Sequence, residues 1–179
     1  MSSHNEPSSP TSPDGTKGRR ELLAYLEGLG IQTRTVDHPA VHTVEQSSSM
    51  DLGLPGADTK NLFLKDDKGA LLLVIAKSST KVDLKRLGRE LGMGRLSFGK
   101  PELMMATLGV TPGSVTAFAI INDTGKRVRV VLDNELTAHE TINCHPMENT
   151  ATTNIALLDL LSFIRGTGHD PEIMIVTGS

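Results

Sequence analysis

Two short apolar runs joined by a polar turn constrain the fold of this chain more than any other feature. The runs cover 61–65 and 70–76, and the turn between them is Asp66-Asp67-Lys68-Gly69. Runs of this length on either side of such a turn are typical of a β-hairpin. The second run is also the longest clean apolar stretch, far short of the roughly 20 residues that a membrane span needs. We therefore expect a protein built around a sheet, with no membrane-spanning segment.

Helix and strand signals surround this hairpin, and no repeat or internal linker divides them. The sequence predicts one α+β domain over 17–179, with a central mixed, largely antiparallel sheet flanked by helices, after a disordered tail at 1–16. Helices are expected at 18–29 with Thr16 as cap, after Asp83 through Leu91, at 101–109 and at 158–165, and a weaker one from Thr43. Further strands are expected at 33–37, 140–144, 152–156 and 172–176, and a second hairpin at 115–121 and 127–132.

Composition excludes several function classes. A single cysteine, Cys144, rules out an internal disulfide and a cysteine metal cage. The histidines show no spacing such as HExxH, so we expect neither a metal nor a cofactor. The N-terminus has no apolar signal core, which predicts a cytoplasmic protein.

Charge is unevenly distributed along the chain. The formal net charge is -3, yet residues 60–100 hold seven lysines and three arginines against three aspartates and one glutamate. Such asymmetry favours one local phosphate-facing surface, or equally a solvated helix face with turn lysines.

Lys60 stands at the entrance of the first apolar strand, in Thr59-Lys60-Asn61-Leu62-Phe63-Leu64. A lysine in this position can hold a phosphate or a carbonyl oxygen as a flexible point charge. The commoner explanation for such a residue is a strand-edge lysine that prevents aggregation.

A glycine- and proline-rich loop occupies 108–116, with the sequence LGVTPGSVT. Its two glycines and one proline would let main-chain groups approach a ligand closely, although a helix stop followed by a turn has the same composition. The loop lacks the GxxxxGK pattern, so nucleoside triphosphate binding is not expected.

The run CHPMENTATT at 144–153 is the most suggestive segment. Adjacent residues of an extended chain point to opposite faces, so Cys144 and His145 are not expected to form a nucleophile–base pair. Cys144 is interpreted as a small buried residue. His145 precedes Pro146, which favours an extended backbone and fixes the direction of the ring. A purely structural histidine is the alternative.

Together these segments resemble the prolyl-tRNA synthetase-associated editing domain family, also called the YbaK-like family. The resemblance covers about 18–176 and rests on the order and spacing of four motifs, at 38–45, 59–66, 108–116 and 145–153. The last motif and the absence of a synthetase body are most similar to the free-standing, alanine-specific branch of that family.

The resemblance implies an enzyme, an aminoacyl-tRNA hydrolase that removes alanine from tRNA(Pro) with water as the nucleophile. Its implied partners are tRNA(Pro) carrying alanine and prolyl-tRNA synthetase, and we expect a monomer. Alternatives are a Cys-tRNA(Pro) deacylase of the same family, a non-catalytic tRNA-binding module, and a small-molecule ester hydrolase, for which no nucleophile is visible.

Residue roles follow from the matched motifs. Lys60 is expected to contact the 3′ end of the tRNA, at its terminal phosphate or at the aminoacyl carbonyl. The implied catalytic residues are Lys60, Gly113 and His145, and the implied substrate-binding residues are Gly109, Pro112, Ser114, Thr116 and Asn149. The basic segment supplies candidate tRNA contacts at Lys77, Lys81, Lys85, Arg86 and Arg89.

Overall fold

The structure, a computed structural model, describes residues 16–40 and 52–178. The tail at 1–15 and the weak helix expected from Thr43 lie outside these ranges. No helix in the described part of the chain is both long enough and apolar enough to cross a membrane.

The first predicted hairpin is confirmed. Strands β2 (Ala57–Lys65) and β3 (Leu71–Lys77) pair antiparallel, with Lys60 opposite Ala76. The Asp66 carboxylate accepts the main-chain N–H groups of Lys68 and Ala70 at 2.9 and 2.8 Å. This turn chemistry fixes the register of the two strands.

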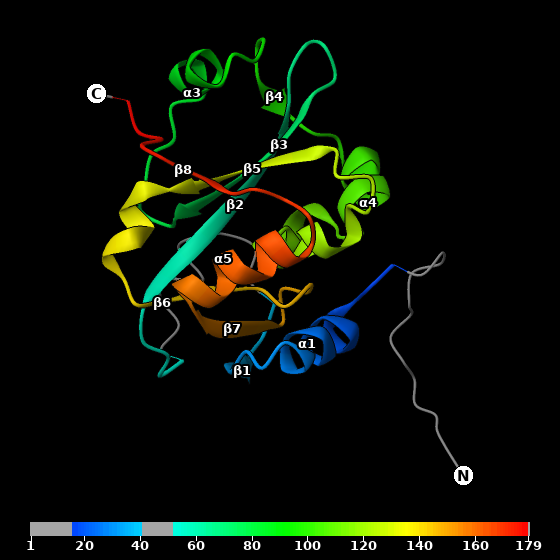
Figure 1. Cartoon of the computed structure of the whole chain (residues 1–179), viewed down its shortest axis with the longest axis vertical. Helices are drawn as coiled ribbons and strands as arrows, with labels where there is room; N and C mark the ends of the chain where they lie inside the picture. The colour runs from blue at the N-terminus through cyan, green and yellow to red at the C-terminus, as the bar shows by residue number, and fades with distance from the viewer. Residues whose placement is uncertain (1–15, 41–51, 179) are drawn as a thin grey trace.

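The hairpin forms the centre of a mixed sheet, as the sequence predicts (Figure 1). The strand order is β1 (Thr33–Asp37), β7 (Ala151–Ala156), β6 (Thr141–Cys144), β2, β3, β5 (Val128–Asp133) and β8 (Glu172–Met174), while β4 (Ser97–Phe98) pairs with the end of β2. Antiparallel and parallel pairs are both present: β2 with β6, β3 with β5 and β5 with β8 are parallel, whereas β6 with β7, β1 with β7 and β2 with β3 are antiparallel.

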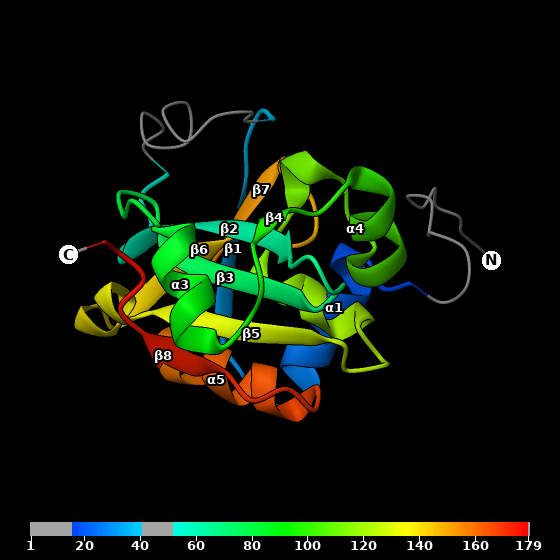
Figure 2. The ribbon, with the colours of Figure 1, turned by 90° about the horizontal axis from the view of Figure 1, so that it is seen from above.

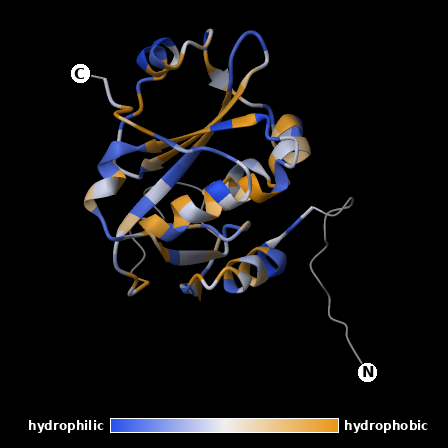
Figure 3. Ribbon diagram, in the orientation of Figure 1, coloured by the Kyte–Doolittle hydropathy of each residue, from blue (hydrophilic) through white to orange (hydrophobic). Residues whose placement is uncertain are grey.

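Two hydrophobic clusters cover the two faces of the central strands. The larger contains the inward-facing residues of α1 (Arg19–Gly28), α4 (Pro101–Leu108) and α5 (Leu157–Gly166). The smaller lies under α3 (Leu84–Leu91), so α3 and α5 lie on opposite sides of the sheet (Figure 2). Helix α3 is drawn mainly in hydrophilic colours (Figure 3), and its Lys85, Arg89 and Glu90 are exposed.

The predicted second hairpin is wrong. Ala117–Asn122 form the 3-10 helix η2, and β5 pairs in parallel with β3 and β8 instead. Every residue from Ala117 to Ile121 is buried. A continuous apolar run without alternation does not distinguish a strand from a buried helical segment.

The helix caps agree with the sequence in two cases and differ in one. The Asp83 carboxylate accepts the Arg86 N–H at 3.1 Å and caps α3. Gly109, with a φ of 71°, ends α4 as expected. The N-cap of α1 is Gly18 rather than Thr16, because the Glu21 carboxylate accepts the Gly18 N–H at 3.0 Å and fixes the start of the helix.

Candidate functional site

The parallel pairing of β2 with β6 brings Lys60 and His145 to the same level of the sheet. The last paired residues are Asp58 and Asn143, and the Asn143 amide donates to the Asp58 carboxylate at 3.1 Å. Lys60 lies two residues after Asp58, and His145 lies two residues after Asn143. Because side chains alternate along a strand, Asp58, Lys60 and Asn143 lie on one face, and His145 directly follows the last residue of β6. Two residues 85 positions apart in the sequence therefore come to the same level of neighbouring strands.

Lys60 is half-buried on the face that carries α3. Leu62 and Leu64, two and four residues further along β2, belong to the smaller hydrophobic cluster on that face. Within residues 16–40 and 52–178, the Lys60 ammonium has no hydrogen-bond or ion-pair partner. Its charge is therefore available to an anionic or carbonyl oxygen.

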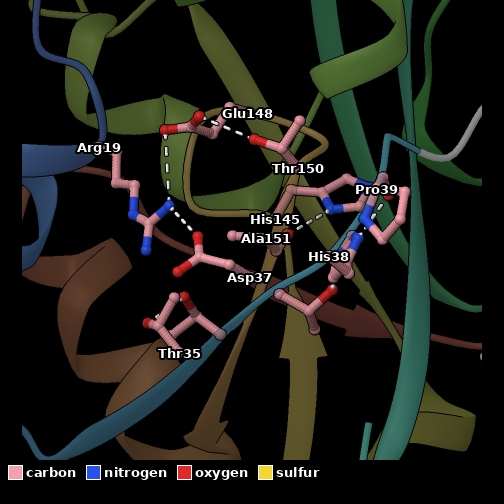
Figure 4. Close-up of polar contacts among 11 residues, drawn as sticks. Arg19, Thr35, Asp37, His38, Pro39, His145, Glu148, Thr150 and Ala151 are labelled. Atoms are coloured by element: carbon pink, nitrogen blue, oxygen red, sulfur yellow. Dashed lines mark hydrogen bonds and ion pairs between the residues drawn. The ribbon is translucent and has the colours of Figure 1, made fainter. Parts of the chain in front are cut away.

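The His145 ring is fixed by the main chain of the following strand. Its Nδ1 donates to the Ala151 carbonyl at 3.1 Å (Figure 4). A carbonyl can only accept, so Nδ1 carries the proton and Nε2 of the neutral ring is an acceptor. Burial lowers the pKa of His145, and the nearby His38 lowers it further. The ring is thus held neutral, with one acceptor nitrogen for a ligand.

His38 is a member of this site that the sequence interpretation missed. Its Nδ1 donates to the Pro39 carbonyl and its Nε2 bonds the Thr152 hydroxyl, each at 2.8 Å. Thr152 directly follows Ala151, whose carbonyl fixes the His145 ring. The His-Pro pair at the start of the first motif was the available signal, but its role depends on the antiparallel pairing of β1 with β7.

The lowered pKa of His145 predicts a pH-dependent stability. The unfolded ring has its ordinary pKa of about 6.5, so between the two values the unfolded chain binds more protons. Stability from this group is present above about pH 6.5 and is lost as the pH falls below it. The free energy of unfolding should fall between pH 7.5 and pH 5.5 by a smaller amount in His145→Asn than in the wild type. Urea titrations of both proteins at both pH values measure this difference. An equal loss in both proteins would remove His145 as the cause.

Gly113 of the glycine loop lies close to the segment that follows His145. Residues Pro112–Ser114 form the 3-10 helix η1, in which Gly113 is exposed and Ser114 is buried. A Cβ added at Gly113 would lie 3.5 Å from Nδ2 of Asn149. Two predicted site residues from distant segments, Gly113 and Asn149, are thus neighbours.

Two other predicted substrate-binding residues have structural roles. Thr116 is fully buried, and its hydroxyl accepts the Phe118 N–H at 3.4 Å to cap η2. This corrects the expectation that Thr116 contacts substrate. Gly109 ends α4 against Asn122, whose amide donates to the Leu108 carbonyl at 3.0 Å. A Cβ at Gly109 would lie 2.8 Å from that amide, so close packing accounts for the glycine.

Cys144 is not a nucleophile in this fold. It belongs to the larger hydrophobic cluster, and its Sγ accepts a hydrogen bond from the Thr59 hydroxyl at 3.6 Å. Burial raises the pKa of the Cys144 thiol to about 12, which leaves almost no thiolate at neutral pH. The expectation of a small buried cysteine is confirmed.

An ion-pair group anchors the run that follows His145. Arg19 of α1 donates to the Asp37 carboxylate of β1 at 2.6 Å and lies 3.9 Å from the Glu148 carboxylate (Figure 4). The Thr150 hydroxyl donates to the other oxygen of Glu148 at 2.9 Å. These contacts tie the segment between His145 and Ala151 to α1 and β1, and the sequence alone did not indicate them.

The predicted tRNA contacts lie at the end of β3, in the turn that follows it and along α3. Lys77 ends β3 opposite Thr59, so its side chain projects from the face opposite to that of Lys60. Lys81, Lys85 and Arg89 are exposed, whereas the Arg86 guanidinium is engaged by Glu90 and by the Thr177 carbonyl, at 2.8 and 2.9 Å. Lys85 and Arg89 also line an open cavity of about 690 Å³ between α3 and the segment 93–96.

Comparison with known proteins decides the family. A family model described as the aminoacyl-tRNA editing domain matches residues 38–163, which include Lys60, the glycine loop and His145. The chain belongs to the aminoacyl-tRNA editing domain family. The match spans more than half of the chain and contains both strands that carry the site.

Individual relatives of this chain are similar to it in sequence over most of their length. The chain is 42% identical to the prolyl-tRNA synthetase associated domain-containing protein 1 of Danio rerio, covering 87% of this chain and 86% of the relative. It is 32% identical to the prolyl-tRNA editing protein ProX of Acetoanaerobium sticklandii, covering 84% and 93%. A crystal structure described as a candidate trans-editing enzyme for prolyl-tRNA synthetase shares the fold, with a TM-score of 0.70 at 20% identity over 95% of this chain and all of the other.

Proposed function

We propose that this protein is a trans-editing deacylase that hydrolyses the ester of alanine wrongly attached to tRNA(Pro). The observation that carries the proposal is the β2–β6 pairing, which brings the lysine and the histidine to the same level of neighbouring strands in an aminoacyl-tRNA editing domain. The proposal includes tRNA(Pro) as the carrier, prolyl-tRNA synthetase as the source of the mischarged tRNA, and a monomeric, cytoplasmic enzyme.

Water is the nucleophile in this proposal. The one cysteine is buried and protonated. An aminoacyl ester is already activated, so positioning and electrostatic stabilisation supply the rate enhancement. Lys60 contacts the terminal phosphate or the aminoacyl carbonyl, and Nε2 of His145 accepts a hydrogen bond from the ribose of the terminal adenosine. The main chain of Pro112, Gly113 and Ser114, together with Asn149, borders the aminoacyl group.

Selection by size is the physical reason for such an enzyme. A synthetase pocket built for proline excludes the smaller alanine poorly, because each missing methylene is worth only about 1–3 kcal/mol. A second site that admits alanine but not the proline ring corrects the error.

A deacylation panel tests the substrate. With purified protein in EDTA, we expect Ala-tRNA(Pro) to lose its amino acid at least roughly tenfold faster than Pro-tRNA(Pro), the discrimination that one to two missing methylenes allow. Cys- and Ser-tRNA(Pro) complete the panel, and each rate is divided by the uncatalysed rate of the same ester. Fastest release from Cys-tRNA(Pro) would move the protein to the cysteine-specific branch.

The exposed cations of α3 are proposed to contact the acceptor stem. Charge reversal by Lys85→Glu should weaken tRNA binding and reduce the slope of log Kd against log salt by about 1–2. Filter binding at several salt concentrations measures this slope. Lys126→Glu, the same charge change in the turn before β5, is the matched control. Equal effects of the two variants would indicate a general charge effect rather than a contact at α3.

A further inference from the structure

One stretch of β2 has no neighbouring strand on one of its sides. Pairing with β6 reaches Asp58, and pairing with β4 begins at Leu64. Within the described ranges, no strand pairs on this side with the residues between them. We call residues 60–62 the open edge of β2.

Asn61 turns its main-chain groups toward this open edge. In the antiparallel pair with β3, the Ser78 N–H donates to the Asp58 carbonyl at 2.8 Å, so residues in step with Asp58 point toward β3. Asn61 is an odd number of residues from Asp58, so its main-chain groups point away from β3. Phe63, two residues further along, points the same way as Asn61, and its carbonyl accepts the Gly99 N–H beside β4 at 2.9 Å. The Asn61 N–H and C=O therefore face the gap between β6 and β4.

The polar groups of Asn61 lack partners in the described part of the chain. Its main-chain N–H and C=O both point away from β3, and neither has a partner there. Its side-chain Oδ1 is buried and accepts no hydrogen bond. Burying such a group is costly unless something else supplies the bond, so the unpaired Oδ1 needs an explanation, and a ligand group can supply one. Asn61 thus carries two acceptors and one donor that no described residue uses.

This set matches the chemistry of an α-amino ester. The α-ammonium group carries only donors, which suit the Oδ1 and C=O oxygens of Asn61, and the ester carbonyl is an acceptor, which suits the N–H. We propose that Asn61 binds the aminoacyl group in this way and is a specificity-determining residue for a free α-amino group. The inference rests on the proposed function and adds the recognition of the ammonium to it.

Neighbouring residues give the two ends of the substrate separate places. Side chains alternate along β2, so Lys60 and Asn61 project from opposite faces of the open edge. Lys60 faces the side of α3, where the exposed cations lie. The phosphate of the RNA end is then bound on that face, while the aminoacyl group reaches Asn61. An ester whose amino group is blocked lacks the donors that the Asn61 oxygens need.

A double comparison of substrate and variant tests this assignment. Deacylation is measured for Ala-tRNA(Pro) and for N-acetyl-Ala-tRNA(Pro) with the wild type, Asn61→Leu and Asn61→Asp, each rate divided by that of the uncatalysed ester. We expect the wild type to favour the free amine at least tenfold. Asn61→Leu should lose about 10- to 100-fold on the free amine and little on the acetylated ester. Asn61→Asp keeps an oxygen acceptor and should preserve the preference for the free amine.

The outcomes separate the inference from the proposed function. Equal loss by Asn61→Leu on both esters, or an unchanged preference for the free amine, would overturn the role of Asn61 while leaving the deacylase intact. A wild type that hydrolyses neither ester would remove the proposed function, and the inference with it. Asn134→Leu, at an exposed asparagine, is the matched control, and Asn61→Asp covers the case in which the leucine variant does not fold.

Discussion

Lys60→Ala is expected to lower kcat/KM for alanine release from Ala-tRNA(Pro) by roughly 100-fold. The half-buried ammonium has no partner within 16–40 and 52–178, so a substrate oxygen is its proposed counter-charge. Loss of one such preorganised donor costs about 2.7–4 kcal/mol in an active site. Single-turnover release of labelled alanine measures the effect, with the free energy of unfolding taken for the same samples.

Lys65→Ala is the matched control for this prediction. It removes the same side chain from the same strand, at the end beside β4. We expect its rate to stay within about threefold of the wild type, since each 1.4 kcal/mol corresponds to a factor of ten and no substrate contact is lost. Normal turnover in Lys60→Ala would remove the lysine from the mechanism, and equal losses in both variants would indicate a general charge effect.

Gly56→Ala is expected to destabilise the fold by about 3 kcal/mol or more. Gly56 has a φ of 86°, and an added Cβ would overlap the main-chain carbonyl of Thr141 in β6. Left-handed strain contributes about 1–3 kcal/mol and overpacking a similar amount. For a domain of this size the melting temperature should fall by roughly 6–12 °C.

The same substitution should also reduce deacylation, because it acts where the site is aligned. The Pro55 carbonyl, one residue before, accepts the amides of Asn143 and Asn154 at 3.1 and 3.0 Å, which holds the start of β2 against β6 and β7. Gly69→Ala is the control: its φ is 88°, but no atom lies within 4 Å of the added Cβ. We expect it to cost only about 1 kcal/mol and to leave activity unchanged. Similar melting temperatures for the two variants would contradict the steric account.

Local signals in the sequence were sufficient for the elements they control. The turn at Asp66 and the cap at Asp83 act within a few residues, and both are found as predicted. The strand predicted at 115–121 was wrong because the burial of the run at 117–121 comes from packing around it. One such contact is the edge-to-face pair of Phe118 and Phe163, whose ring centroids are 5.6 Å apart. Residues buried on every side carry no alternation that a sequence could reveal.

In the candidate site, too, local motifs could be read from the sequence, whereas tertiary contacts could not. Lys60 and His145 could be named from their motifs, but their proximity depends on a parallel pairing between strands far apart in the sequence. The buried position of Thr116 and the bond of His38 to Thr152 likewise follow from tertiary contacts. The roles assigned to Lys60, Gly113 and His145 stay predictions until the variants are measured.

Release of labelled alanine from Ala-tRNA(Pro) by the wild-type protein in EDTA tests the deacylase itself. The account predicts a rate that rises in proportion to protein concentration and exceeds uncatalysed ester hydrolysis by at least about 100-fold. Tight binding of the charged tRNA together with a release rate equal to that of the uncatalysed ester would contradict it. The protein would then be a tRNA-binding module that has kept the editing fold without its reaction.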